Sequence, residues 1–274
     1  MRMDNVTQGV DVWPALPARV VSLSIAQPLT PEALQALPAL RMYSGPVSPD
    51  PALDLGQLTY LNVSGAFLLT PAHASTCREL DQLLGATEAF AEALPAATKA
   101  RMRWLGIPEV VGAATLAPFE SLTYLSVTWL GEDTEELPPR LRTLDLQHNR
   151  PDMLPRGCSS PMRIAEIINR CPSLTSLQLN TLAKSHDAPP LQMWLAPFRD
   201  AGAVMPNVRS LGGTSLTERR ASWDMVREVF PNLADAPVAG GGARRARRKT
   251  RRSGSRGQPR SSRGQPRTIV TRKA

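Results

Sequence analysis

The sequence predicts an α/β fold built from stacked repeats, each supplying one short parallel strand and one helix or irregular segment. The clearest unit is the thirteen-residue stretch 137–149, in which Leu144 and Leu146 alternate with polar residues, as in a strand with one buried face. Residues 16–25 match the start of this stretch at the Leu-Pro, the Arg and all three apolar positions. Because a single unit has too little apolar surface to fold alone, an internal repeat indicates that the units stack on one another.

Weaker copies of the unit occur at irregular intervals along the chain. They share an apolar residue that is followed three positions later by a second one. These two positions are Leu40 and Tyr43, Leu58 and Leu61, Met102 and Leu105, Leu122 and Leu125, Leu174 and Leu177, and Val208 and Leu211. A third position, two residues further on, is Val63, Ile107, Val127 or Leu179 in four copies and Gly45 or Gly213 in two. The uneven spacing predicts an imperfect solenoid with insertions between its strands.

The spacing of Leu141, Leu144, Leu146 and Asn149 resembles the L-x-x-L-x-L-x-x-N pattern of the leucine-rich-repeat family, although Pro151 stands where a further Leu is expected. The junction of a helix with the run CPSLTSLQL at 171–179 resembles the repeats of intracellular F-box and ribonuclease-inhibitor-like leucine-rich proteins. The Leu-Pro start of the unit also resembles repeats of some bacterial effectors. The resemblance implies a solenoid with parallel strands on its concave side and helices or irregular segments on its convex side.

Short helices are expected between the strands. Thr30 and Ser160 stand as N-caps before prolines, which favours helices over 30–37 and 160–168. A helix is also expected over 222–229, before a terminal capping unit at 230–233. The long interval from Val63 to Met102 is expected to be mostly helical. One predicted helical face there holds Cys77, Leu80, Leu83 and Leu84, and the next holds Ala89, Phe90, Ala93 and Leu94.

The predicted organisation has three parts: a lead-in over 1–13, the irregular solenoid over 14–238 and a disordered Arg-rich tail over 239–274. The tail contains 13 of the 32 Lys and Arg residues and no Asp or Glu, so the other 19 basic residues stand against 24 acidic ones. The folded part is thus mildly acidic, and the basic isoelectric point comes from the tail. With many like charges and few apolar residues, the tail cannot bury enough surface to fold.

A soluble intracellular protein, nuclear or cytoplasmic, is expected. The three cysteines form no C-x-x-C pair and are too few for a disulfide framework. No signal peptide is recognisable, and no apolar run approaches the roughly 20 residues of a membrane span. We therefore expect no membrane partner.

No catalytic constellation is visible in the sequence. His73, His148 and His186 lie on separate segments without metal-ligand spacing, and neither a phosphate-binding loop nor a G-x-S-x-G motif occurs. We expect no enzyme activity, no cofactor, no metal and no small-molecule substrate. The alternative is a ligase or hydrolase whose site lies in the 66–100 insertion, where Cys77 is the one thiol to test.

The residues that alternate with the buried positions are expected to form the partner-binding surface. The predicted partner-binding residues on this concave face are Tyr60, Asn62, Trp104, Tyr124, Ser126, Thr143, Asp145, Ser176 and Gln178. Tyr and Trp are enriched at interaction hot spots, so aromatic rings among small polar groups favour protein recognition. The alternative is that Tyr60 and Trp104 pack against the 66–100 insertion instead of a partner.

The sequence thus favours a non-catalytic scaffold that binds an unidentified protein on the concave face. The tail would direct it to the nucleus or contact RNA or another polyanion through Arg244, Arg245, Arg247, Arg248, Lys249, Arg251, Arg252, Arg256, Arg260, Arg263 and Arg267. One alternative is a nucleic-acid-binding protein that works through this tail. The resemblance to F-box proteins implies another, a substrate-recognition subunit of a ubiquitin ligase. No F-box is visible before the first strand, so in that case the chain is expected to be a fragment.

Overall fold

The computed structural model describes residues 2–6, 16–63, 69–147, 156–180, 191–212 and 223–233. The chain divides into two units, Met1–Gly241 and Gly242–Ala274. The second unit lies wholly outside the described residues, and with it the arginines of the predicted tail. The turn that contains His148 and Pro151 also lies outside them.

The first unit is built on one ten-stranded sheet, in which every strand pair is parallel and the strands follow their order in the sequence. The strands are β1 (Arg2–Val6), β2 (Ser22–Ile25), β3 (Met42–Gly45), β4 (Tyr60–Val63), β5 (Gln82–Leu84), β6 (Trp104–Val111), β7 (Tyr124–Leu130), β8 (Thr143–Gln147), β9 (Ser176–Asn180) and β10 (Ser210–Gly212). The predicted α/β class with short parallel strands is confirmed.

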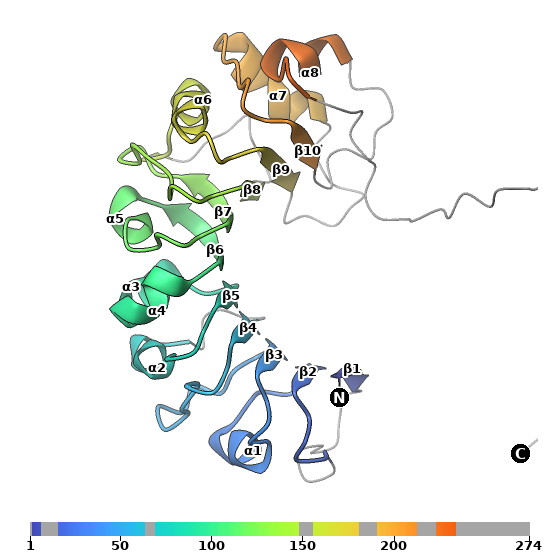
Figure 1. Cartoon of the computed structure of the whole chain (residues 1–274), viewed down its shortest axis with the longest axis vertical. Helices are drawn as coiled ribbons and strands as arrows, with labels where there is room; N and C mark the ends of the chain where they lie inside the picture. Colours follow the sequence, from blue (N-terminus) through green and yellow to red (C-terminus); the bar gives the residue numbers. More distant parts are fainter. Residues whose placement is uncertain are drawn as a thin grey trace, which may run out of the picture. The chain divides into compact units, whose positions relative to one another are not determined.

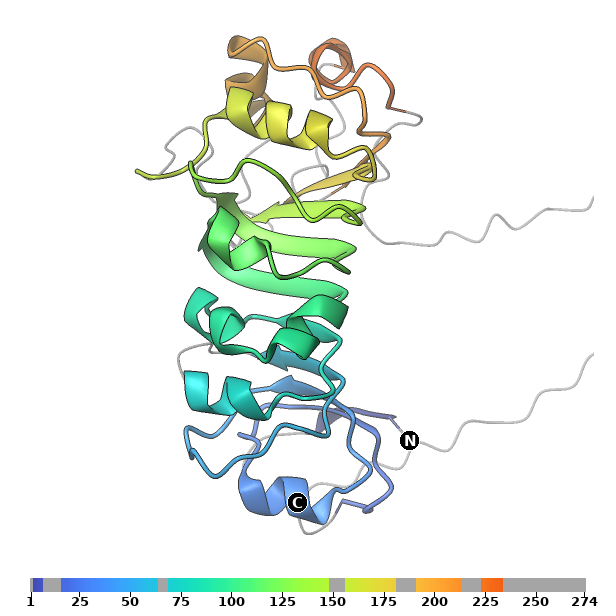
Figure 2. The ribbon, with the colours of Figure 1, turned by 60° about the vertical axis from the view of Figure 1, so that its left-hand side comes forward.

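Helices follow the strands and lie on one side of the sheet (Figures 1 and 2). They are α1 (Pro31–Ala36), α2 (Pro71–Thr76), α3 (Glu88–Ala93), α4 (Ala96–Arg101), α5 (Ala113–Leu116), α6 (Pro161–Arg170), α7 (Leu191–Asp200) and α8 (Trp223–Val229). Among the described residues no helix combines the length and the apolar character that crossing a membrane requires. The face of the sheet opposite these helices is called the open face below.

The capping residues seen in the sequence start two of the helices. The Thr30 hydroxyl accepts a hydrogen bond from the Ala33 amide at 3.2 Å at the start of α1, and the Ser160 hydroxyl accepts one from the Arg163 amide at 3.2 Å at the start of α6. Each hydroxyl satisfies an amide that has no partner inside the helix. The predicted helices over 30–37, 160–168 and 222–229 are confirmed, with ends shifted by one or two residues.

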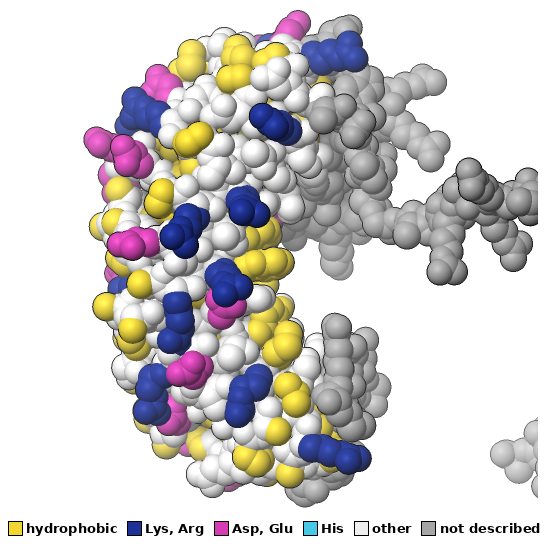
Figure 3. All heavy atoms as spheres, in the orientation of Figure 1, with side chains coloured by type: hydrophobic (Ala, Val, Ile, Leu, Met, Phe, Trp, Pro, Cys, Tyr) yellow, Lys and Arg dark blue, Asp and Glu magenta, His cyan; other side chains and the backbone are white. Residues whose placement is uncertain are grey.

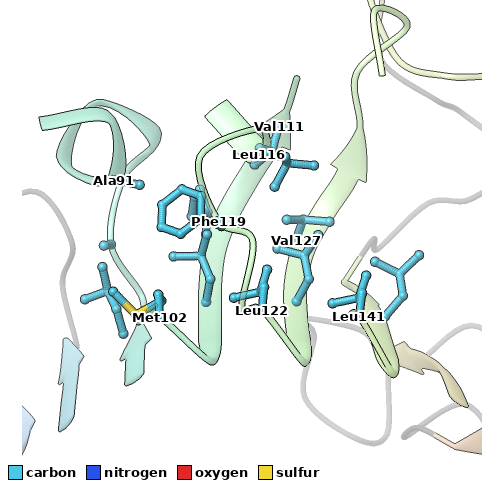
Figure 4. Packing of buried hydrophobic residues seen from close by; sticks show 14 of the residues in the cluster. Ala91, Met102, Val111, Leu116, Phe119, Leu122, Val127 and Leu141 are labelled. Carbon is cyan, nitrogen blue, oxygen red and sulfur yellow. The ribbon is translucent and has the colours of Figure 1, made fainter. Parts of the chain in front are cut away.

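The repeated apolar positions form one continuous core between the sheet and the helices (Figure 4). The second position of each unit lies on the helix-covered face, in register with its neighbours: Leu23, Tyr43, Leu61, Leu83, Leu105, Leu125, Leu144, Leu177 and Leu211. All nine are buried, and none is more than 5% exposed. The predicted stacking of distant leucines around a shared interior is therefore confirmed.

Two predictions for individual segments are wrong. Residues 77–84 do not form a helix: α2 ends at Thr76, and Gln82–Leu84 is strand β5, which brings a further repeat into the sheet. The leucines at 80 and 83 have the same spacing on a helix face as in a repeat unit, so periodicity alone does not separate the two. Residues 2–6, expected as part of a lead-in, pair with β2 as strand β1. Helices α2, α4, α5 and α7 were not predicted individually.

Candidate functional site

The predicted binding residues fall on the open face in two columns that cross the sheet. The first column is Ser22, Met42, Tyr60, Gln82, Trp104, Tyr124, Thr143, Ser176 and Ser210. The second column is Ser24, Ser44, Asn62, Leu84, Gly106, Ser126, Asp145, Gln178 and Gly212. Sequence reasoning placed all nine predicted residues in the correct column, but it missed Gln82 and Leu84, because it missed their strand.

The sequence had placed Tyr60, Trp104 and Tyr124 on consecutive units, because strand β5 was not recognised, but in the structure they are not consecutive. Gln82 of β5 lies in register between Tyr60 and Trp104, so Tyr60 is separated from the other two rings by a whole strand. Trp104 and Tyr124 are direct neighbours, and their rings stack with centroids 4.9 Å apart and planes 27° from parallel. Trp104 is 41% exposed, which is unlike a residue buried beneath the 66–100 segment.

A buried carboxylate holds the Tyr124 side of this stack in place. Asp145 is only 2% exposed, and its Oδ2 accepts hydrogen bonds from the Tyr124 hydroxyl at 2.9 Å and the Ser126 hydroxyl at 3.0 Å. The Gln147 side-chain amide donates to the same oxygen at 3.1 Å and to the Ser126 hydroxyl. Burial, and then the negative charge of Asp145, raises the pKa of Tyr124, so this phenol stays protonated and keeps donating.

The network fixes the position of the Tyr124 ring, against which Trp104 stacks. A tyrosine tied at its hydroxyl loses little further rotamer freedom when a partner binds, and a rigid ring loses less entropy on binding than a mobile one. Beside the pair lies a hollow of about 280 Å³, lined in part by Asn62, Gly106 and Ile107. The open face therefore offers an exposed indole, a braced phenol and an adjacent depression for an inserted side chain.

Replacing the buried carboxylate is expected to weaken the fold. In Asp145→Ala the Tyr124 and Ser126 hydroxyls lose their acceptor, and leaving a buried donor unpaired costs about 1–3 kcal/mol. Urea unfolding followed by circular dichroism measures this loss. The control is Asp200→Ala, which removes the same side chain from an exposed ion pair with Arg199 and is expected to cost less than about 1 kcal/mol. Equal unfolding midpoints for the two variants would show that the network contributes nothing.

The alternative catalytic thiol has the surroundings of a core residue. Cys77 is fully buried, and burial, followed by the charge of Asp54, raises its thiol pKa to about 12. A thiol in this state forms little of the thiolate that acts as a nucleophile. The neighbouring His73 is also buried: its Nδ1 accepts from the Thr70 amide at 3.2 Å, and its Nε2 donates to the Asp50 carbonyl at 2.8 Å. Both ring nitrogens are thus used in holding a loop to α2.

No group of three or more His, Cys, Asp or Glu side chains with the geometry of a metal site occurs within the described ranges. Gln147, which belongs to the Asp145 network, is a further residue that sequence reasoning missed. Thr143, Asp145 and Gln147 are each two residues apart on β8, so all three lie on the same face of the strand. This alternation could have indicated Gln147.

No protein-family model matches the sequence, and a search of curated proteins likewise gives no match.

Proposed function

We propose that this protein is a non-catalytic scaffold that binds a protein partner on the open face, which serves as the concave side of a leucine-rich-repeat solenoid. The observation that carries the proposal is the Trp104–Tyr124 stack, braced by buried Asp145 on a face that the described helices leave uncovered. A solvent-exposed indole next to an anchored phenol has the composition of an interaction hot spot.

The polar surroundings of the pair support a protein partner. Ser22, Ser44, Asn62, Ser176 and Gln178 are partly exposed and lie in the two columns around the aromatic pair. A hydrophobic centre with a rim of hydroxyl and amide groups is the usual composition of a non-obligate interface. The Arg-rich tail would then determine where the scaffold acts, through nuclear import or contact with a polyanion.

The test is a quantitative affinity purification with the triple variant Tyr60→Ala, Trp104→Ala and Tyr124→Ala. A specific partner captured by the wild-type protein is expected to be depleted about thirtyfold or more, because hot-spot residues contribute at least about 2 kcal/mol each when truncated. The matched control is Val21→Ala, Met162→Ala and Val204→Ala, which truncates three apolar side chains outside the two columns that are about as exposed as Trp104. Unchanged capture by the aromatic variant, with its fold intact by circular dichroism, would refute the proposal.

The second candidate function is nucleic-acid binding through the tail, favoured by its 13 basic residues. The same assay separates the two functions when it is repeated without residues 239–274. The scaffold proposal requires partner capture to survive this deletion and polyanion binding to be lost. Loss of all binding would favour the tail as the functional part. Substrate recognition for a ubiquitin ligase is a narrower form of the scaffold proposal, and it would require the captured partners to include ligase components.

A further inference from the structure

The residues immediately before the strands form a third row, at the edge where the strands begin. This row consists of Arg41, Thr59, Asp81, Arg103, Thr123, Arg142, Thr175 and Arg209. From Thr59 onward, the backbone amide of each member donates a hydrogen bond of 2.8–3.1 Å to the carbonyl of the member before it. Four of these eight residues are arginines and one is acidic. Figure 3 shows Lys and Arg side chains recurring from one end of the described fold to the other on the face that it presents.

The arginines concentrate around one groove, where β6, β7 and β8 begin. The groove has a volume of about 760 Å³, and its lining includes Arg101, Arg103, Arg140, Arg142, Thr123 and Trp104. No Asp or Glu is among its lining residues. Trp104 belongs both to this groove and to the first column of the open face, so the groove adjoins the proposed binding surface.

The four guanidinium groups have few partners of their own. Arg140 and Arg142 are exposed, and neither forms an ion pair with a described residue. The Arg103 Nε lies 3.5 Å from an Asp81 carboxylate oxygen in a solvent-accessible ion pair. Such a pair contributes little to stability, so Arg103 can leave Asp81 for an anion of higher charge.

Arg101 has a polar atom that needs an acceptor. Its Nε donates to the Leu80 carbonyl at 3.4 Å, while its Nη2 is buried without a hydrogen-bond partner among the described residues. Buried donors are almost always paired in native structures. An anion in the groove would place negative charge beside this guanidinium group.

We infer that this groove binds the phosphate group of a phosphorylated peptide segment. Arg103 and Arg142 stand two strands apart across Thr123, about 10 Å at the usual strand spacing, so their long side chains can reach a group held between them. A phosphate has nearly two negative charges and three acceptor oxygens, which suits several guanidinium groups at once. The basic tail of the chain is excluded as an occupant, because its charge has the same sign.

The aromatic geometry favours a peptide over a nucleic acid. Proteins that bind single strands stack bases on open aromatic faces. The Trp104 ring already stacks on Tyr124 on one side, and on the other side the neighbouring position in the sheet is filled by Gln82. The exposed part of the Trp104 ring is suited to contact a side chain of a peptide that runs from the groove onto the open face.

The experiment is a fluorescence-anisotropy titration of the full chain with a short labelled peptide of Gly, Ala and Ser that contains one central phosphoserine, at physiological salt. The variant Arg103→Gln with Arg142→Gln is expected to bind about tenfold more weakly or worse, because hydrogen bonds to charged groups contribute about 1.5–3 kcal/mol each. The matched control, Arg41→Gln with Arg209→Gln, removes the same charge from the same row outside the groove and is expected to bind like the wild type.

Each other outcome would overturn the inference. Equal weakening of peptide binding in both double variants would show that the phosphopeptide is attracted by the overall positive charge and not by the groove. The basic tail is present in all these proteins, so it contributes equally to each. Equal binding of a peptide with glutamate in place of phosphoserine would assign the groove to acidic segments. Tighter binding of a short oligouridine through Arg103 and Arg142 would assign it to nucleic acid.

The inference rests on the proposed function only in taking the ligand to be part of a protein. The titration needs no identified partner, so its failure leaves the affinity test of the aromatic column unaffected. Conversely, an aromatic variant that still captures its partner would refute the scaffold surface, while the titration would still report on the groove.

Discussion

Leu144→Ala is expected to lower the free energy of unfolding by about 2–5 kcal/mol, the range for truncating a buried leucine whose surroundings cannot close the cavity. Leu144 is fully buried and lies in register between Leu125 of β7 and Leu177 of β9. Its side chain therefore contributes to the packing of three consecutive units. Urea unfolding followed by circular dichroism gives the difference.

The matched control is Thr143→Ala, one residue earlier on the same strand. Thr143 lies on the open face, where no described helix covers it, and its replacement is expected to cost less than about 1 kcal/mol. A Leu144 variant no less stable than the Thr143 variant would mean that the alternation of buried and open-face residues has been assigned to the wrong sides of the sheet.

Gly85→Ala is the second change expected to destabilise the fold strongly, by more than about 2 kcal/mol. Gly85 has φ +77°, and an L side chain in this left-handed region costs about 1–2 kcal/mol by itself. A Cβ atom at this position would also lie 2.3 Å from the Val63 carbonyl oxygen, so the backbone of β4 would have to move. Thermal unfolding of the variant measures the sum of the two costs.

Gly157→Ala separates these two contributions. Gly157 has nearly the same backbone conformation, φ +79°, but a Cβ atom there would meet no atom of the described residues within 4 Å. This variant is expected to show only the left-handed cost of about 1–2 kcal/mol. If the two alanine variants melted together, close approach to Val63 would play no part.

Local chemistry allowed much of the fold to be read from the sequence. The first and second apolar positions of the units, the caps Thr30 and Ser160, and the faces on which Trp104 and Tyr124 lie are set by alternation and by side-chain hydrogen bonds over a few residues. Such signals survive in a single sequence because each depends on neighbours along the chain.

The remaining features depend on residues far apart in the sequence. Strand β5 was missed because Leu80, Leu83 and Leu84 also lie on one face of a helix, and only pairing with β4 and β6 distinguishes the strand from a helix. The bracing of Tyr124 by Asp145 and Gln147 joins two strands, and the arginine groove joins the beginnings of β6 and β8. Neither arrangement has a local pattern, because each arises only when the units are in register.

The agreement between strand order and sequence order bears on how the protein is made. Each strand from β2 onward pairs with the strand that precedes it in the chain. During synthesis from the N-terminus, the strand with which each new strand pairs has therefore already left the ribosome. No new strand depends on a preceding neighbour that is still to be translated. Growth of the sheet can keep pace with translation, one unit at a time.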